Sequence, residues 1–224
     1  DVLVFCVRNA ETITIPNFIE TIEPYSFGYC QFLFEIKIQD ESKLRTIEKN
    51  AFSYSNIKSI TIPPSLIDLE EGWCKNALYL NEFKVSEKNP KYSNYENQFI
   101  IGKSSSDKEN FDVLVFCSRN VEIAIIPDFI EIIGAYSFQG CNKLQQVLFL
   151  DDSKLKIIKN NAFDNSSINY INIPYNVTQI EQKAFFSCIE LESVTIQENS
   201  KLQKIGKKAF ASTVIKSFKI PKHV

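Results

Sequence analysis

The sequence contains no methionine and only one histidine, His223, which lies next to the C-terminal residue. A single terminal imidazole gives no support for a histidine-based metal site or a histidine acid–base pair. C-x-x-C, H-E-x-x-H and G-x-S-x-G motifs are also missing. The acidic stretch 107–112 lacks the alternating oxygen ligands of a calcium loop. We therefore predict no catalytic residues, no cofactor and no metal site, and a protein that is not an enzyme.

The sequence also lacks a charge excess and a long apolar run. Its 25 basic and 27 acidic residues are interspersed and leave a net charge of −2, which argues against nucleic acid as a partner. No apolar run approaches the roughly 20 residues needed to cross a bilayer. The sequence therefore shows no membrane-spanning segment and no signal peptide.

Five prolines reveal an internal repeat. One and the same interval separates Pro16 from Pro63, Pro127 from Pro174, and Pro174 from Pro221, whereas the interval from Pro63 to Pro127 is longer. Each regular interval holds two Ala-Phe or Ser-Phe pairs, so the repeating unit is about 23 to 24 residues long. A unit this short cannot bury an apolar face alone, so the period predicts a stack of coils.

The frame of one unit reads I-P-x-x-I-x-x-I-x-x-x-A/S-F-x-x-C-x-x-L-x-x-I, as in residues 15–36 and 173–194. Its I-x-I end alternates with period 2 and predicts a short strand, whereas the Ala-Phe stretch suits a helical turn. The frame resembles the BspA-like leucine-rich repeat, found in surface proteins of bacteria and protozoa. The predicted fold is an α/β leucine-rich-repeat solenoid, right-handed, with a parallel β-sheet on one face, short helical turns on the other and one inserted β-hairpin.

A second repetition relates residues 1–85 to residues 112–196, which align without gaps from Asp1 on Asp112 onward. The extra residues of the long proline interval contain two apolar runs, 98–101 and 111–116, around a polar Gly/Ser turn. Such a pattern predicts a β-hairpin. We therefore expect residues 1–224 to form a single leucine-rich-repeat domain, with residues 89–117 as an inserted hairpin arm. Neither end reads as a polar cap, so we expect a piece of a longer array that can associate end to end.

The six cysteines do not read as a disulfide framework. Cys30, Cys141 and Cys188 share one frame position, which serine occupies in the intervening units. Alternate coils lie about 9.6 Å apart, whereas a disulfide needs Cα atoms within about 7 Å. We therefore expect buried thiols that act as small core residues. Cys6 and Cys117, in the predicted hairpin strands, are either packing residues or reactive thiols.

The residues between the core isoleucines of each strand face outward, and most of them are polar. The exceptions cluster on consecutive strands, and two tyrosines in the arm's lead-in loop are additional candidate contacts. The candidate partner-binding surface therefore comprises Ile123, Ile125, Leu148, Leu150, Tyr170, Tyr92 and Tyr95. A contiguous apolar patch indicates a covered or a binding surface. Either the hairpin arm folds over it or a partner protein binds there.

The resemblance implies a non-enzymatic protein-binding module of a cell-surface or secreted antigen. Such a module would adhere to a protein ligand, such as a host extracellular-matrix or cell-surface protein. The alternative is an intracellular scaffold that uses the same face. Two N-x-S/T sequons begin at Asn165 and Asn176, and Asn176, in the loop after an I-P pair, is the candidate glycosylation site.

Overall fold

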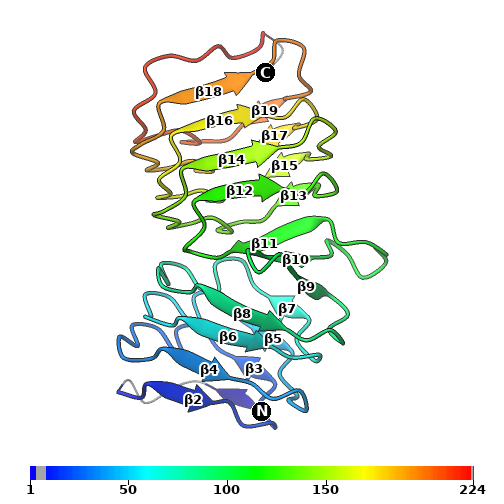
Figure 1. The fold of residues 1–224 in the computed structure, drawn as a ribbon, viewed down its shortest axis with the longest axis vertical. Coiled ribbons are helices and arrows are strands. Elements are labelled where there is room, and N and C mark those ends of the chain that lie inside the picture. Colours follow the sequence, from blue (N-terminus) through cyan, green and yellow to red (C-terminus); the bar gives the residue numbers. More distant parts are fainter. Residues whose placement is uncertain (4–8, 223) are drawn as a thin grey trace. The chain divides into compact units, whose positions relative to one another are not determined.

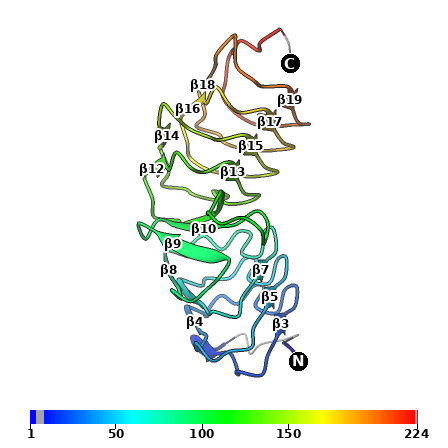
Figure 2. The same cartoon turned by 90° about the vertical axis from the view of Figure 1, so that its right-hand side faces the viewer.

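The computed structural model describes residues 1–3, 9–222 and 224. They form two compact units, residues 1–102 and residues 103–224. Each unit is a stack of coils, and most coils contribute one strand to each of two parallel sheets (Figure 1). Within each unit, the two sheets lie on opposite sides of the coils (Figure 2).

In the first unit, the I-x-I segments form one parallel sheet, and pairs of residues that precede the Ala-Phe turns form the other. The I-x-I strands are β2 (Thr12–Thr14), β4 (Glu35–Lys37), β6 (Ser59–Ile62) and β8 (Glu82–Val85). The opposite sheet consists of β1 (Val2–Leu3), β3 (Thr21–Ile22), β5 (Thr46–Ile47) and β7 (Asp68–Leu69).

The second unit repeats this arrangement. Its I-x-I strands are β12 (Ile123–Ile126), β14 (Gln146–Phe149), β16 (Tyr170–Ile173) and β18 (Ser193–Ile196). On the opposite side lie the parallel strands β11 (Val113–Cys117), β13 (Ile132–Ile133), β15 (Ile157–Ile158), β17 (Gln179–Ile180) and β19 (Lys204–Ile205). The segment 218–220, which precedes Pro221 and where the repeat predicts a further strand, is not a strand.

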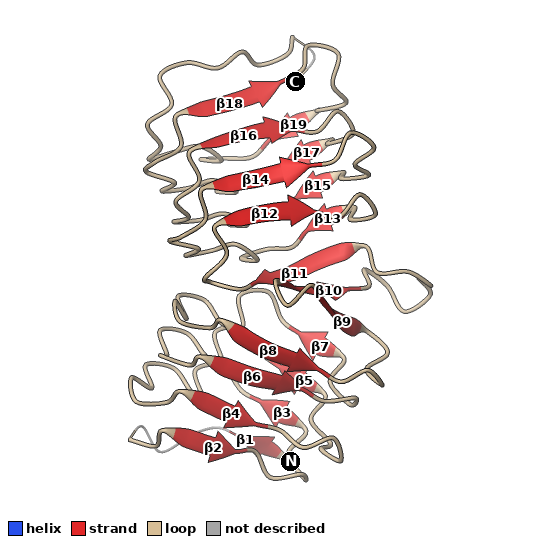
Figure 3. Ribbon diagram, viewed as in Figure 1, coloured by secondary structure: helices blue, strands red, loops and turns tan. Residues whose placement is uncertain are grey.

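The prediction of short helical turns is wrong. No helix occurs among the described residues, and the Ala-Phe stretches are turns (Figure 3). Their amide groups bond the next coil: the Phe163 N–H donates to the Ala184 carbonyl at 2.7 Å, and the Asn165 N–H to the Phe186 carbonyl at 2.9 Å. A helix would need those N–H groups for carbonyls one helical turn earlier in the chain. Asn161 and Asn165 also have positive φ angles of 55° and 56°, which end any helical run.

The phenylalanine of each Ala-Phe pair fills the interior between the two sheets. In the second unit, Phe138, Phe163, Phe185 and Phe210 form a continuous stack, with ring centroids 4.6 to 5.0 Å apart. The frame isoleucines surround them and are also buried. The predicted frame is therefore confirmed as the core. All five described cysteines, Cys30, Cys74, Cys117, Cys141 and Cys188, are buried and form no disulfide, whereas Cys6 lies outside the described residues.

Both apolar runs of the predicted arm contain strands, β10 (Phe99–Gly102) in the first unit and β11 in the second. Within the first unit, β10 pairs antiparallel with β9 (Tyr92–Tyr95), which the sequence did not predict. Buried Asn89 precedes β9 and bonds four backbone groups of the first unit. Over the described ranges, no helix is long and apolar enough to cross a membrane.

Candidate functional site

The candidate surface lies on the outer face of the sheet formed by β12, β14, β16 and β18. Parallel register sets Ile125 directly beside Leu148 and places Gln146 between Ile123 and Tyr170. Alternation within each strand sends the intervening residues, such as Ala124 and Val147, into the core. The face therefore gathers the predicted residues of the second unit into one patch.

These apolar side chains are exposed. Ile123, Ile125, Leu148, Leu150 and Tyr170 keep 38 to 51% of their surface accessible. Every other side chain that points outward from these four strands is uncharged, namely Gln146, Asn172, Ser193 and Thr195. We name this surface, the outward residues of β12 to β18 together with Leu150, the uncharged face.

The first unit carries different chemistry at the equivalent positions. In the alignment of residues 1–85 with residues 112–196, Thr12 stands at the place of Ile123, Thr14 at that of Ile125 and Lys37 at that of Leu148. Lys37 forms an exposed ion pair with Glu35 at 3.3 Å. The same fold thus presents a polar and charged sheet face in the first unit and a more apolar one in the second. The apolar character is therefore not a requirement of the fold.

A cleft of about 320 Å³ adjoins the uncharged face beyond the ends of β14 and β16. Leu148, Leu150 and Tyr170 line one part of it, and Tyr175 lines another. Tyr175 is exposed, and the Lys201 ammonium lies 5.3 Å from its ring centroid. The sequence analysis did not single out Tyr175, although its place directly after an I-P pair marks it as a loop residue beside the sheet.

The structure corrects one predicted contact. Tyr92 is 5% exposed, and its hydroxyl accepts a hydrogen bond from the Leu69 N–H at 2.9 Å. Burial raises the pKa of Tyr92 to about 12. Its ring belongs to the core of the first unit and cannot reach a partner. Tyr95, in the same strand, is half-buried and stays a predicted contact.

Strand β11 does not cover the uncharged face. It pairs with β13 in the opposite sheet of the second unit, and Phe116 points into the core. Within the second unit, the arm is therefore a core strand rather than a lid.

The candidate glycosylation site, Asn176, makes two hydrogen bonds that bear on its use. The Asn176 amide nitrogen donates a hydrogen bond to the Ser153 carbonyl at 2.9 Å, and its oxygen accepts one from Lys201 at 2.9 Å. An amide nitrogen carries two hydrogens, so one remains for a sugar. Glycosylation of Asn176 stays a prediction.

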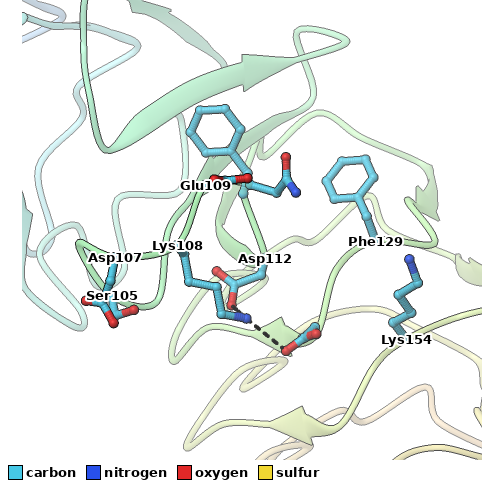
Figure 4. Close-up of a pocket in the computed structure, with 10 residues that line it drawn as sticks. Ser105, Asp107, Lys108, Glu109, Asp112, Phe129 and Lys154 are labelled. Carbon is cyan, nitrogen blue, oxygen red and sulfur yellow. Dashed lines mark hydrogen bonds and ion pairs between the residues drawn. The ribbon is translucent and has the colours of Figure 1, made fainter.

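A larger cavity, of about 730 Å³, lies beside loop 105–112 (Figure 4). Lys108 crosses it and bonds Asp112 at 2.8 Å and Glu131 at 3.2 Å, and Lys156 bonds the same Glu131 oxygen at 3.0 Å. Burial opposes ionisation of Asp112, but its hydrogen bonds from Lys108 and Ser104 outweigh burial and lower its pKa. The pKa of Glu131 is lowered too, chiefly by its bond from Lys156. These charges satisfy one another, which indicates a structural network.

Acid is expected to weaken this network. Because the folded state lowers both carboxyl pKa values, its stabilisation is present at neutral pH and is lost as the pH falls below the ordinary values of 3.8 and 4.5. Asp112→Asn should therefore cost about 1–2 kcal/mol at pH 7 and much less at pH 3. Denaturant unfolding at both pH values measures the difference. Glu109→Gln, on the exposed rim, is the control, and an equal cost of Asp112→Asn at both pH values would contradict the assignment.

Among the residues that the structure describes, no three histidine, cysteine, aspartate or glutamate side chains gather as a metal ion requires. No chemistry beyond binding is evident from the arrangement of the uncharged face.

Residues 3–99 and 110–224 match the family model of the BspA type leucine rich repeat region, in six copies. No curated protein sequence matches the chain significantly.

Several solved structures match the chain, and two of them are similar to it over most of its length. One is a leucine rich cell surface protein from Faecalibacterium prausnitzii A2-165, with 22% identity and a TM-score of 0.66 over 90% of this chain and 57% of that one. The other is the pneumococcal vaccine antigen PcpA, with 21% identity and a TM-score of 0.67 over 96% of this chain and 61% of that one. The chain thus spans less than two thirds of either protein.

Proposed function

Because the chain belongs to the family of BspA-type leucine-rich repeats, we propose that it is a non-enzymatic protein-binding module of a cell-surface or secreted protein. Its role is adhesion to a protein ligand on a host cell or in the extracellular matrix. The observation that carries the proposal is the uncharged face of the second unit, where Ile125 and Leu148 stand side by side and exposed. Exposed apolar residues that are contiguous are typical of protein interaction sites.

The chemistry of the face defines the partner surface. Protein interfaces have apolar centres with aromatic residues and few charges, and the uncharged face offers Tyr170 with aliphatic neighbours. The cleft beside Tyr175 can accept one side chain of the partner as an anchor. The partner therefore presents an apolar surface with a protruding apolar or aromatic residue.

Surface exposure of the whole protein is supported by the family and by the fold of a leucine rich cell surface protein. An intracellular scaffold would use the same face. A glycan on Asn176 of the native protein would exclude the scaffold, because N-glycosylation occurs in the secretory pathway. Mass spectrometry of the native protein distinguishes the two.

Leu148→Asp is expected to weaken binding on the order of 30-fold, because it places a charge at the centre of the apolar patch. The probes are a panel of purified extracellular-matrix proteins and intact host cells, tested with labelled protein in a surface binding assay. Leu148 is part of the exposed face, so we expect stability to change by about 1 kcal/mol or less.

The matched control is Thr14→Asp, which puts the same charge on the equivalent sheet of the first unit. It should bind as the unmodified protein does. If Leu148→Asp remains folded and binds every probe as tightly as the control, the uncharged face is not the binding site. A large loss of stability in Leu148→Asp would show instead that the leucine serves packing.

A further inference from the structure

Lysines gather in a groove of the second unit, where the segments that follow the I-x-I strands stack on one another. The groove has a volume of about 400 Å³ and is lined by Glu131, Lys154, Lys156, Asn176, Thr178 and Lys201. We name it the lysine groove. It adjoins the cavity beside loop 105–112, because Glu131 and Lys154 line both. The acidic Asp151 lines the cleft beside the uncharged face instead.

The stacking of coils fixes the spacing of these lysines. Lys154 precedes β15 and Lys201 precedes β19, and β17 lies between those two strands in the sheet. The backbones of Lys154 and Lys201 are therefore about 9.6 Å apart, twice the strand spacing. Their N–H groups donate to the carbonyls of Asp128 and Tyr175 in the preceding coils, each at 2.9 Å. The groove thus offers a ligand side chains rather than unbonded backbone groups.

The groove carries more positive than negative charge. Glu131 is the one acid among its described lining residues, and it already bonds Lys108 at 3.2 Å and Lys156 at 3.0 Å. Within the part of the chain that the structure describes, the ammonium groups of Lys154 and Lys201 have no carboxylate partner. Both side chains are exposed. Because the whole chain has a net charge of −2, this is a local site for an anion and not a general attraction.

Neutral groups complete the groove. The Thr178 hydroxyl donates to the Lys156 carbonyl at 3.1 Å, so its oxygen can still accept a hydrogen bond. Asn176 keeps one amide hydrogen beyond its bond to a backbone carbonyl. In the adjoining cavity, Phe129 and Lys154 are lining residues from neighbouring coils (Figure 4). The negative face of an aromatic ring attracts partly positive C–H groups, such as those of a sugar ring.

We propose that the lysine groove binds a sulfated polysaccharide, as a second site beside the uncharged face. A lysine ammonium is a point charge that suits a tetrahedral oxyanion, whereas a planar carboxylate is best recognised by the two-pronged guanidinium of arginine. Repeated sulfate groups along one chain meet Lys154, Lys156 and Lys201 on successive coils, and sugar hydroxyls suit Asn176 and Thr178. An extended peptide gains affinity from backbone bonds at a sheet edge, which this groove does not offer.

Heparin is the probe, measured by surface plasmon resonance against the chain produced without N-glycans, because a glycan on Asn176 would fill the groove. Completely desulfated heparin, polyglutamate and a thymidine oligonucleotide are the comparison probes. We expect binding to heparin and at least about tenfold weaker binding to each of the others. Equal binding of polyglutamate would assign the groove to acidic peptides, and equal binding of the oligonucleotide would assign it to polyphosphates. Either result, or no binding of heparin, would overturn the proposal.

A double variant locates the site. Lys154→Gln combined with Lys201→Gln should weaken heparin binding on the order of 10-fold. The slope of log Kd against log salt concentration should fall by about two, one released counterion for each lost charge. The matched control combines Lys37→Gln and Lys84→Gln. It removes the same two charges at the same two-strand spacing in the first unit, where Glu35 bonds Lys37 at 3.3 Å. Equal losses in both double variants would overturn the assignment to the groove.

Lysine acetylation of the unmodified chain gives a readout that does not depend on a variant. Heparin should protect Lys154 and Lys201 from acetylation several-fold more than Lys37 and Lys84, as measured by mass spectrometry of the digested peptides. Equal protection of all four lysines would contradict the proposal. Leu148→Asp should bind heparin as the unmodified chain does, so failure of the uncharged face as a protein site and failure of the lysine groove are distinguishable.

Discussion

Replacement of Phe163 with alanine is expected to lower the free energy of unfolding by about 3–5 kcal/mol. The Phe163 ring is fully buried and stacks on Phe138 at 4.6 Å and on Phe185 at 4.9 Å. Its removal leaves a cavity in the middle of the second unit, where neighbouring coils on both sides lose a contact. Denaturant unfolding, followed by circular dichroism, measures the loss.

The control is Phe32→Ala, which removes the same ring from an exposed position. Its effect should stay within about 0.5 kcal/mol. If both substitutions cost the same, the stacked phenylalanines would not be the principal core of the solenoid.

Asn89→Ala is expected to cost about 2–4 kcal/mol, because it leaves several buried backbone groups without their bonds. The Asn89 amide nitrogen donates to the carbonyls of Pro63 and Leu66 at 2.7 and 2.9 Å. Its oxygen accepts from the N–H groups of Lys91 and Tyr92 at 2.9 and 2.8 Å. One side chain thereby ties the start of the β9–β10 hairpin to the preceding coil.

Asn94→Ala tests whether this cost is specific. Asn94 also bonds through its amide, to Asn97 in the exposed hairpin turn, where water can replace the lost bonds. We expect less than about 1 kcal/mol. Thermal or denaturant unfolding of both variants compares them, and an equal loss would refute the role given to Asn89.

The sequence could predict the I-x-I strands and the core because both follow from a local pattern. Period-2 alternation predicts that Ala124 faces inward and that Ile123 and Ile125 face outward. The structure confirms all three orientations. The patch residues on β12, β14 and β16 could be found for the same reason: parallel coils at a fixed period place like positions side by side.

The turns could not be predicted from the local pattern. Ala-Phe stretches contain good helix formers, but their N–H groups bond carbonyls of the next coil, as Phe163 does with Ala184. Such bonds exist only once the coils stack. The prediction of Tyr92 as a partner contact is wrong because its hydroxyl accepts a hydrogen bond from the Leu69 N–H of another coil. The local sequence does not reveal this contact.

The burial of Arg119 could not be predicted for a similar reason. Its guanidinium donates hydrogen bonds to the backbone carbonyls of Cys117 and Ser137, and Ser137 belongs to the next coil. An arginine in such a polar stretch reads as a surface residue.

Cross-linking from the uncharged face tests the central claim most directly. A photoreactive amino acid replaces Leu148 in one protein and Lys37, the equivalent residue of the first unit, in another, and each is illuminated with the extracellular-matrix protein that binds the unmodified chain most tightly. The account predicts strong covalent capture from position 148 and little from position 37, with the cross-linked partner peptide rich in apolar residues. Equal capture from both positions, or capture from position 37 alone, would contradict it.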